Sequence, residues 1–229
     1  MPDKIVVLSG SGLSAESGLP TFRDAAGLWH EHSWMELASP AGWRKHPQLV
    51  LAFYNERRAK AWNAAPNAAH RAIAELEKHF DVAVITQNVD NLHERAGSTR
   101  VLHLHGELAF ARGSGPGRKR YRIDGAPIAL GQTCEEGTQL RPDIVWFGEE
   151  TQNMDAAREH VQGAAKVLVV GTSLSVYPAA SLVEFAPAHA EKVLNSIEME
   201  CVPRGFEFLP GRATEIVPRI TARWSAALD

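Results

Sequence analysis

The sequence Lys4-Ile-Val-Val-Leu-Ser-Gly-Ser-Gly-Leu-Ser14 joins a β-branched apolar run to two closely spaced glycines. An apolar strand that stops at a glycine turn is typical of the start of a nucleotide-binding βα unit. Gly10 and Gly12 would let the backbone approach a pyrophosphate, and the N–H groups of the following helix would face its charge. Gly18 comes six residues after Gly12, not three as in dehydrogenases, and a simple tight turn explains this stretch about equally well.

Other apolar runs predict further strands of the same sheet. Residues 82–85, 101–104 and 166–170 are short and apolar, and each run is followed by glycine or polar residues. Because ligands bind at the carboxyl ends of the strands in open parallel sheets, we expect the loops after these strands to form one site. Strands are also predicted at 142–149 and 192–194, and helices at 47–62, 67–79, 155–162, from 178 and from 214.

The run from Val101 ends in His105 and Gly106. A histidine titrates near neutral pH, and a glycine permits a sharp exit from the strand, so His105 is a candidate general base. Taken alone, His103 or His105 is more simply explained as an ordinary histidine beside the core.

The predicted helix 47–62 has Phe53 on its apolar side and Arg58 on its polar side. Tyr54 and Arg57 are three residues apart and share a face. A guanidinium beside a phenol hydroxyl could clamp a carboxylate, although a solvated helix face is the simpler explanation.

The stretch 108–140 is rich in glycine and arginine and has little apolar periodicity. Its basic run contains no acid: Arg112, Arg118, Lys119, Arg120 and Arg122. We expect an inserted small lobe outside the parallel sheet, with the basic run solvated in a loop or, alternatively, bound to an acidic partner.

With 229 residues, of which 45% are apolar and 22% charged, the chain has the composition of a soluble globular protein with a sizeable core. The net charge of -3 gives no general reason to expect nucleic acid or a membrane as a partner. Cys134 and Cys201 are too far apart in the sequence to indicate a disulfide framework or a cysteine metal site. No apolar run approaches the length of a signal segment or membrane span, so a cytoplasmic location is the expectation.

Several motifs stand in one order along nearly the whole chain, and together they resemble the sirtuins, the NAD-dependent protein lysine deacylases. The matching segments are 10–14, 17–23, 86–90, 92–93, 105–106, 145–149, 171–174 and 178–179. The resemblance implies an α/β fold, with a Rossmann-like parallel sheet, helices on both faces and a small domain formed by two insertions. The large domain would comprise about 1–28, 80–107 and 141–229, and the insertions would be about 29–79, helical, and 108–140, normally zinc-bearing.

The resemblance also implies residue roles. NAD would be held by Gly10, Ser11, Gly12, Ser14, Phe22, Arg23, Gln87, Asn88, Asp90, Gly171, Thr172, Ser173, Ser196 and Ala213. His105 would be the general base, and Asn88 would also belong to the catalytic centre. The acyl-lysine oxygen would displace nicotinamide at the ribose, and His105 would then help a ribose hydroxyl attack, giving free lysine, nicotinamide and O-acyl-ADP-ribose.

On the substrate side, the resemblance implies that an acyl-lysine peptide or protein binds by strand addition. The residues involved would be Val145, Phe147, Gly148, Glu149 and Tyr177. Tyr54 and Arg57 are similar to the Tyr-x-x-Arg of the desuccinylase-like branch, where the pair binds an acidic acyl group, and Thr21 agrees with that branch. We therefore expect removal of succinyl-type groups, with acetyl groups alongside, by a monomer.

The lobe 108–140 departs from the family pattern. A structural zinc needs four thiolates there, but the lobe contains only Cys134. We predict that zinc is absent and that ordinary packing holds the lobe.

Two other functions remain open at this stage. The chain could be an NAD or ADP-ribose binding module that has lost turnover, although such a module has no need of the base His105. It could also be an NAD glycohydrolase or ADP-ribosyltransferase. The pair of Tyr54 and Arg57 favours deacylation over these two activities.

Overall fold

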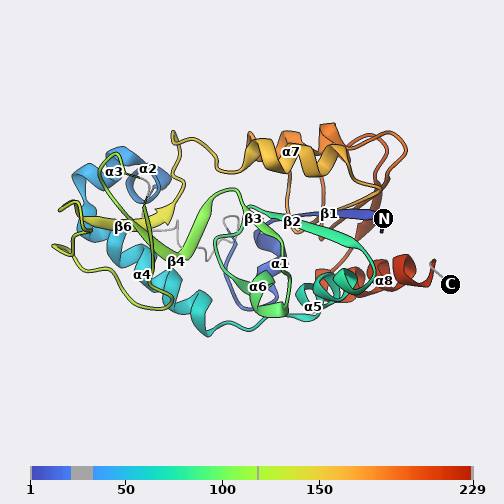
Figure 1. Cartoon of the computed structure of the whole chain (residues 1–229), viewed down its shortest axis with the longest axis horizontal. Coiled ribbons are helices and arrows are strands. Elements are labelled where there is room, and N and C mark those ends of the chain that lie inside the picture. Colours follow the sequence, from blue (N-terminus) through green and yellow to red (C-terminus); the bar gives the residue numbers. More distant parts are fainter. Residues whose placement is uncertain (1, 22–32, 118, 228–229) are drawn as a thin grey trace.

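The computed structural model describes residues 2–21, 33–117 and 119–227, and a six-stranded parallel sheet forms its centre (Figure 1). In spatial order the strands are β3 (Val101–His103), β2 (Asp81–Thr86), β1 (Lys4–Ser9), β7 (Lys166–Val170), β8 (Glu191–Ser196) and β9 (Glu207–Pro210). The chain moves outward from β1 on one side and then returns to build the other side. Ligand crevices form at such a reversal of strand order, outside the carboxyl ends of the strands.

The sheet is buried on both faces because its side chains alternate. In β1, Ile5 and Val7 pack with α5 (Ala68–Glu75) and α8 (Ala213–Ala226). Val6 and Leu8 pack on the opposite face with α7 (Met154–Gln162) and the 3-10 helix η2 (Ala179–Phe185). Figure 1 shows α7 on one side of the sheet and α5 and α8 on the other. The predicted α/β class, with helices on both faces, is confirmed.

A second, antiparallel sheet lies at one end of the molecule, beside the helices of residues 34–63 (Figure 1). Its strands are β4 (Gly106–Gly113), β5 (Arg120–Arg122) and β6 (Leu140–Ile144). The neighbouring helices are α2 (Trp34–Leu37), α3 (Pro40–Lys45) and α4 (Pro47–Asn63). Phe53 of α4 shares one apolar cluster with Leu108 and Ile144, and Leu51 shares another with Ala111 and Leu140. The two segments predicted as insertions therefore pack on each other, while their boundaries stay a prediction.

Arg58 was expected on the polar face of α4, and this was wrong. Its side chain is buried, with Nε donating to the carbonyl oxygen of Leu108 at 2.6 Å. One of its terminal nitrogens donates to Asn55 Oδ1 at 2.7 Å. The amide of Asn55 also exchanges hydrogen bonds with the main chain of Ile128. α4 therefore packs against the small sheet through this side as well, and its solvated face is the row of Ala52, Glu56, Lys60 and Asn63.

The strand predicted over 142–149 stops at Ile144. Beyond it, the Glu149 carboxylate accepts a hydrogen bond from the Trp146 N–H, and the Glu149 N–H donates to the Trp146 carbonyl oxygen. Gly148 has a φ of 90°, which a β-strand does not allow. These contacts close a turn where the apolar sequence indicated a strand.

The short helix expected after Gly12 is present as α1 (Ser11–Ala15). The other short elements were not predicted individually: they are α2, α3, β5, α6 (Leu92–Ala96) and β9, and the segment predicted as a helix from residue 178 is a 3-10 helix. Segments of three to six residues give too few repeats for a periodic pattern to stand out.

The basic run is neutralised by neighbouring acids. Arg120 contacts Glu107 and Asp143, Lys119 contacts Glu135, and Arg122 contacts Asp124. Arg112 contacts Asp143 and Glu149. Arg118 lies outside the described residues. The side chains of Lys119, Arg120 and Arg122 are exposed, as the sequence indicated, but they are paired with acids, and Arg120–Arg122 form a strand and not a loop.

No helix in the described part of the chain has both the length and the apolar character needed to cross a membrane.

Candidate active site

A cleft of about 630 Å³ lies at the carboxyl ends of β1, β2, β7 and β8 and extends to α4 and the turn after β6. It is lined by all of the predicted site residues that the structure describes. From the cofactor set these are Gly10, Ser11, Gly12, Ser14, Gln87, Asn88, Asp90, Gly171, Thr172, Ser173, Ser196 and Ala213. From the catalytic and substrate sets they are His105, Tyr54, Arg57, Val145, Phe147, Gly148, Glu149 and Tyr177. Phe22 and Arg23 lie outside the described residues.

The glycines at the start of the site allow two loops to touch. A Cβ on Gly12 would lie 2.9 Å from the Gly171 Cα, and one on Gly10 would lie 2.7 Å from the Thr172 Cβ. The N–H groups of Gly10 and Gly12 donate to the carbonyl oxygens of Val170 and Gly171. The glycines therefore fit the loop after β1 against the loop after β7, a role that the pyrophosphate interpretation did not anticipate.

The loop after β2 connects these two loops. Asn88 Nδ2 lies 3.1 Å from both the Gly10 carbonyl oxygen and Ser14 Oγ. Gln87 Nε2 donates to Thr172 Oγ1 at 3.2 Å. Asp90 is buried, and burial raises the pKa of its carboxyl group although the Leu92 N–H donates to it. Amide, hydroxyl and carboxyl groups suited to ribose hydroxyls or a carboxamide are thus held together at this edge.

His105 follows β3 and has the hydrogen bonding of a base. Its Nδ1 lies 3.2 Å from the carbonyl oxygen of Gln87. Because a carbonyl oxygen only accepts, Nδ1 carries the proton and Nε2 keeps its lone pair. Burial lowers the pKa of His105, which favours the neutral imidazole near pH 7. Gly106, with a φ of 79°, turns the chain sharply at this point, as the sequence indicated.

Three residues lie at the far end of the cleft, near β8 and the start of α8. Ser173 Oγ and Ser175 Oγ are 2.7 Å apart, and Ser196 Oγ donates to the Glu198 carbonyl oxygen. Ala213 is the buried first residue of α8. These residues could hold the adenosine end of a dinucleotide, whose nicotinamide end would then lie near Asn88 and His105.

Tyr54 and Arg57 face the cleft from α4. Trp146 Nε1 donates to the Tyr54 hydroxyl oxygen at 3.1 Å. Burial raises the pKa of Tyr54, so its hydroxyl keeps its proton. Arg57 is half-buried, its guanidinium lies 5.6 Å from the Phe53 ring centre, and burial lowers its pKa although Tyr54 and Asp90 oppose that shift.

Arg141 is a residue of the site region that the sequence interpretation missed. Its guanidinium lies 3.2 Å from the centre of the Trp146 ring. Two of its nitrogens donate to the two carboxylate oxygens of Glu149 at 2.7 and 3.0 Å. Glu149, predicted to bind substrate, therefore lines the cleft with a carboxylate that already orders the turn. The signal in the sequence was an arginine inside the apolar stretch 140–147.

Exposed aromatic side chains form the rim of the cleft. Tyr177 is 69% exposed and Phe147 is 48% exposed, and Phe147 makes an edge contact with Trp34. The N–H groups of Val145 and Phe147 donate to the carbonyl oxygens of His105 and Ala38. Pairing of this segment with a peptide main chain would therefore depend on its other polar groups.

The lobe around Cys134 does not fit a structural zinc. A Cβ on Gly113 would lie 2.9 Å from Cys134 Sγ, and that sulfur is 3.2 Å from Thr138 Oγ1. Cys134 packs against the apolar cluster of Leu51 and Ala111, and no second thiol is present in the lobe. A four-thiolate site cannot be assembled from these residues.

Comparison with known proteins agrees with the geometry. The sequence of residues 10–178 matches the pattern that defines the Sir2 family. An NAD-dependent protein deacylase of Helicobacter pylori (strain ATCC 700392 / 26695) is 53% identical over 194 residues, covering 85% of this chain and 83% of the relative. One from Shewanella oneidensis is 41% identical over 230 residues, covering 96% and 93%. A solved complex of a Sir2 homologue with NAD is 38% identical, with a TM-score of 0.90, and the match covers 100% of this chain and 91% of that chain.

Proposed function

This chain belongs to the Sir2 family and is an NAD-dependent protein deacylase, and we propose that the lysine acyl group it prefers is acidic, as a succinyl group is. The supporting observation is that Tyr54 and Arg57 line the same cleft as His105. A guanidinium presents a planar fork of N–H donors that matches a carboxylate, so an anionic acyl group in the cleft would bind the half-buried Arg57 through charge-assisted hydrogen bonds.

The Tyr54 hydroxyl would act as the second donor of the clamp. Its oxygen already accepts the Trp146 N–H, and its own proton can therefore be directed to another acceptor. A carboxylate is such an acceptor, whereas the methyl of an acetyl group is not. The pair would thus favour succinyl-lysine over acetyl-lysine while leaving the deacylation chemistry common to both.

The other residues would act on the cofactor and the reacting oxygens. When bound, NAD supplies the ribose carbon to which the acyl oxygen is transferred. The loop of Gln87, Asn88 and Asp90 would orient the ribose and nicotinamide. His105 would take a proton from a hydroxyl group through Nε2, because its Nδ1 is held by the Gln87 carbonyl oxygen.

We further infer that the protein works as a monomer on acyl-lysine proteins. The cleft with its described site residues is formed within one chain. Its aromatic rim at Phe147 and Tyr177 offers apolar surface to a peptide that crosses the opening.

The test is a paired assay on one peptide that carries either succinyl-lysine or acetyl-lysine, with and without NAD. We expect NAD-dependent loss of both groups, with the larger kcat/KM for succinyl-lysine and O-acyl-ADP-ribose as a product by mass spectrometry. A ratio that favours acetyl-lysine would contradict the acyl preference. Binding of NAD without turnover of either peptide would indicate a binding module instead.

A further inference from the structure

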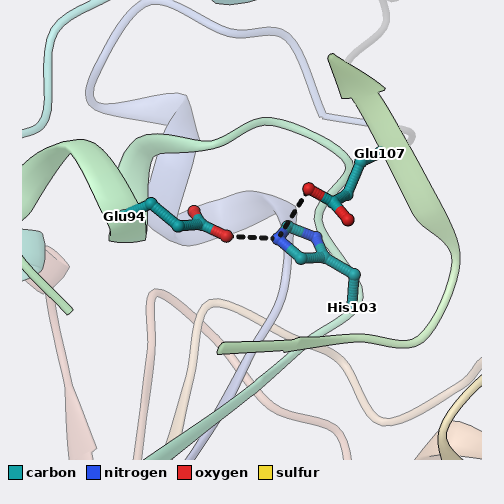
Figure 2. A group of neighbouring side chains, drawn as sticks. All are labelled: Glu94, His103 and Glu107. Carbon is teal, nitrogen blue, oxygen red and sulfur yellow. Dashed lines mark hydrogen bonds and ion pairs between the residues drawn. The ribbon is translucent and has the colours of Figure 1, made fainter. Parts of the chain in front are cut away.

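His103 lies two residues before His105 and has very different surroundings. It is buried at the end of β3, and Figure 2 shows its ring between the carboxylates of Glu94 and Glu107. His103 Nε2 is 2.8 Å from Glu94 Oε1 and 3.9 Å from Glu107 Oε2. Its Nδ1 is 2.9 Å from the carbonyl oxygen of Asn88.

These partners fix the protonation of the ring. The carbonyl oxygen of Asn88 only accepts, so Nδ1 must carry a proton. An ionised carboxylate also only accepts, so Nε2 at 2.8 Å from Glu94 must carry a proton too. With both ring nitrogens protonated, His103 is an imidazolium, whereas His105 is a neutral imidazole.

The hydrogen bond of Nδ1 reaches the loop that carries the proposed cofactor groups. The Asn88 side chain holds Gly10 and Ser14, and the Gln87 carbonyl oxygen, one peptide earlier, holds His105 Nδ1. Fixing the main chain at Asn88 therefore fixes both the amide of the site and the partner that sets the tautomer of the base.

We propose that His103 is a positioning residue of the deacylase, held as an imidazolium by Glu94 and Glu107 so that it anchors the loop of Gln87 and Asn88 under the active site. This inference rests on the proposed roles of His105 and Asn88. His103 itself contacts neither the cleft nor the reacting atoms, and it acts through the loop.

The charges around His103 come from several elements. Glu94 belongs to α6 and Glu107 to β4, and Arg120 of β5 shares the Glu107 carboxylate. Buried Asp90 and His93 also interact with its charge. Burial by itself would lower the pKa of His103, but the hydrogen bond and charge of Glu94, with Glu107 and the Asn88 carbonyl, raise it above its ordinary value.

The protonation state can be measured on the wild-type protein. In ¹⁵N spectra of labelled histidine at pH 7, we expect both ring nitrogens of His103 to be protonated and those of His105 to show one protonated and one bare nitrogen. A neutral His103 at pH 7 overturns the proposal. So does a bound divalent cation, detected by elemental analysis, whose removal alters the His103 signal, because a cation at Nε2 would take the place of the proton.

The effect on catalysis is tested with Glu94→Gln. Removing the closer carboxylate should lower the His103 pKa, shift the alkaline limb of the pH–rate profile to lower pH by about one unit, and cost roughly tenfold in kcat/KM at pH 8. Glu94→Asp should restore part of the loss, and His79→Gln, a change at an exposed histidine, should alter neither the profile nor the rate.

An unchanged pH profile in Glu94→Gln refutes the positioning role. This failure is distinct from failure of the proposed function, in which the wild-type protein would not deacylate or His105 would prove dispensable. The histidine spectra do not depend on either activity.

Discussion

The two sides of the cleft are built from different kinds of groups. The side formed by the parallel sheet uses mainly main-chain contacts and neutral amides and hydroxyls, such as Gly10 against Thr172 and the Asn88 amide on Ser14, with the buried carboxyl group of Asp90 among them. The opposite side uses buried ion pairs, above all Arg141 with Glu149. Neutral groups leave a dinucleotide's own charges undisturbed, whereas a charged frame can select the charge of an acyl group. We infer that the first side sets the reaction and the second side sets the substrate.

The largest expected effect comes from the neutral side. His105→Tyr should lower kcat for both acyl peptides by about a hundred- to ten-thousandfold, since it removes the general base. NAD binding, measured by calorimetry, should remain. If either peptide were still deacylated at the wild-type rate, His105 would not be the general base, and the sheet side of the cleft would not set the reaction.

The second largest effect is a loss of stability in acid, because the sheet side of the protein contains buried uncharged histidines. Burial lowers the pKa of His70 from 6.5 to about 4, and that of His93 well below its ordinary value. The unfolded chain then binds more protons than the folded one below pH 6.5, so stability falls as the pH falls toward 4. His70 alone should cost about 2 to 3 kcal/mol between pH 6.5 and 4.5.

Urea unfolding at several pH values measures this dependence. His103, whose pKa is raised, is charged in the folded state throughout that range, and in the unfolded chain it becomes charged as the pH falls below 6.5. It should therefore contribute to the slope only near pH 6.5, and with the opposite sign. His70→Gln should flatten the pH dependence, even if it lowers stability at pH 7. If stability falls with pH as steeply in the variant as in the wild type, the loss of stability in acid does not come from His70.

The next effect belongs to the charged side. Arg57→Met removes the proposed partner of the acyl carboxylate and should reduce kcat/KM for succinyl-lysine by roughly ten- to a hundredfold, the worth of a charge-assisted hydrogen bond. Acetyl-lysine turnover should change far less. Equal losses on both substrates would mean that Arg57 supports the structure of the cleft and does not select the acyl group. The inference that the two sides of the cleft have different roles would then be wrong.

The smallest expected effect comes from Trp146, which contacts the Tyr54 hydroxyl and would not contact the acyl group itself. Trp146→Phe keeps the aromatic packing but removes the N–H that donates to the Tyr54 hydroxyl, which is worth about 1 kcal/mol. Succinyl-lysine turnover should therefore fall about fivefold while acetyl-lysine turnover is preserved, as measured in the same paired assay. A larger loss with acetyl-lysine would mean that Trp146 supports the cleft in general.

The two sides also differed in how far the sequence predicted them. The parallel sheet was predictable because its apolar runs and the turns at Gly10 and Gly171 are local patterns. Arg58 and Arg141 could not be placed, since their partners, the Leu108 carbonyl and the Glu149 carboxylate, join segments that only the folded chain brings together. The segment 145–149 misled because its apolar residues favour a strand, while the Glu149 side chain closes a turn. The residue roles and the absence of zinc stay predictions.

The central position of β1 also bears on how the chain acquires its structure during synthesis. Its two neighbours are β2, which begins at Asp81, and β7, which begins at Lys166. A nascent chain that has not yet extended past β7 exposes one complete edge of β1, a strand that is buried from Ile5 to Ser9 in the folded protein. Such distant pairing slows folding and leaves the intermediate prone to aggregation. β1, which leads into the glycine loop of the cleft, is thus synthesised before both of its neighbours and is fully paired only once β7 has been made.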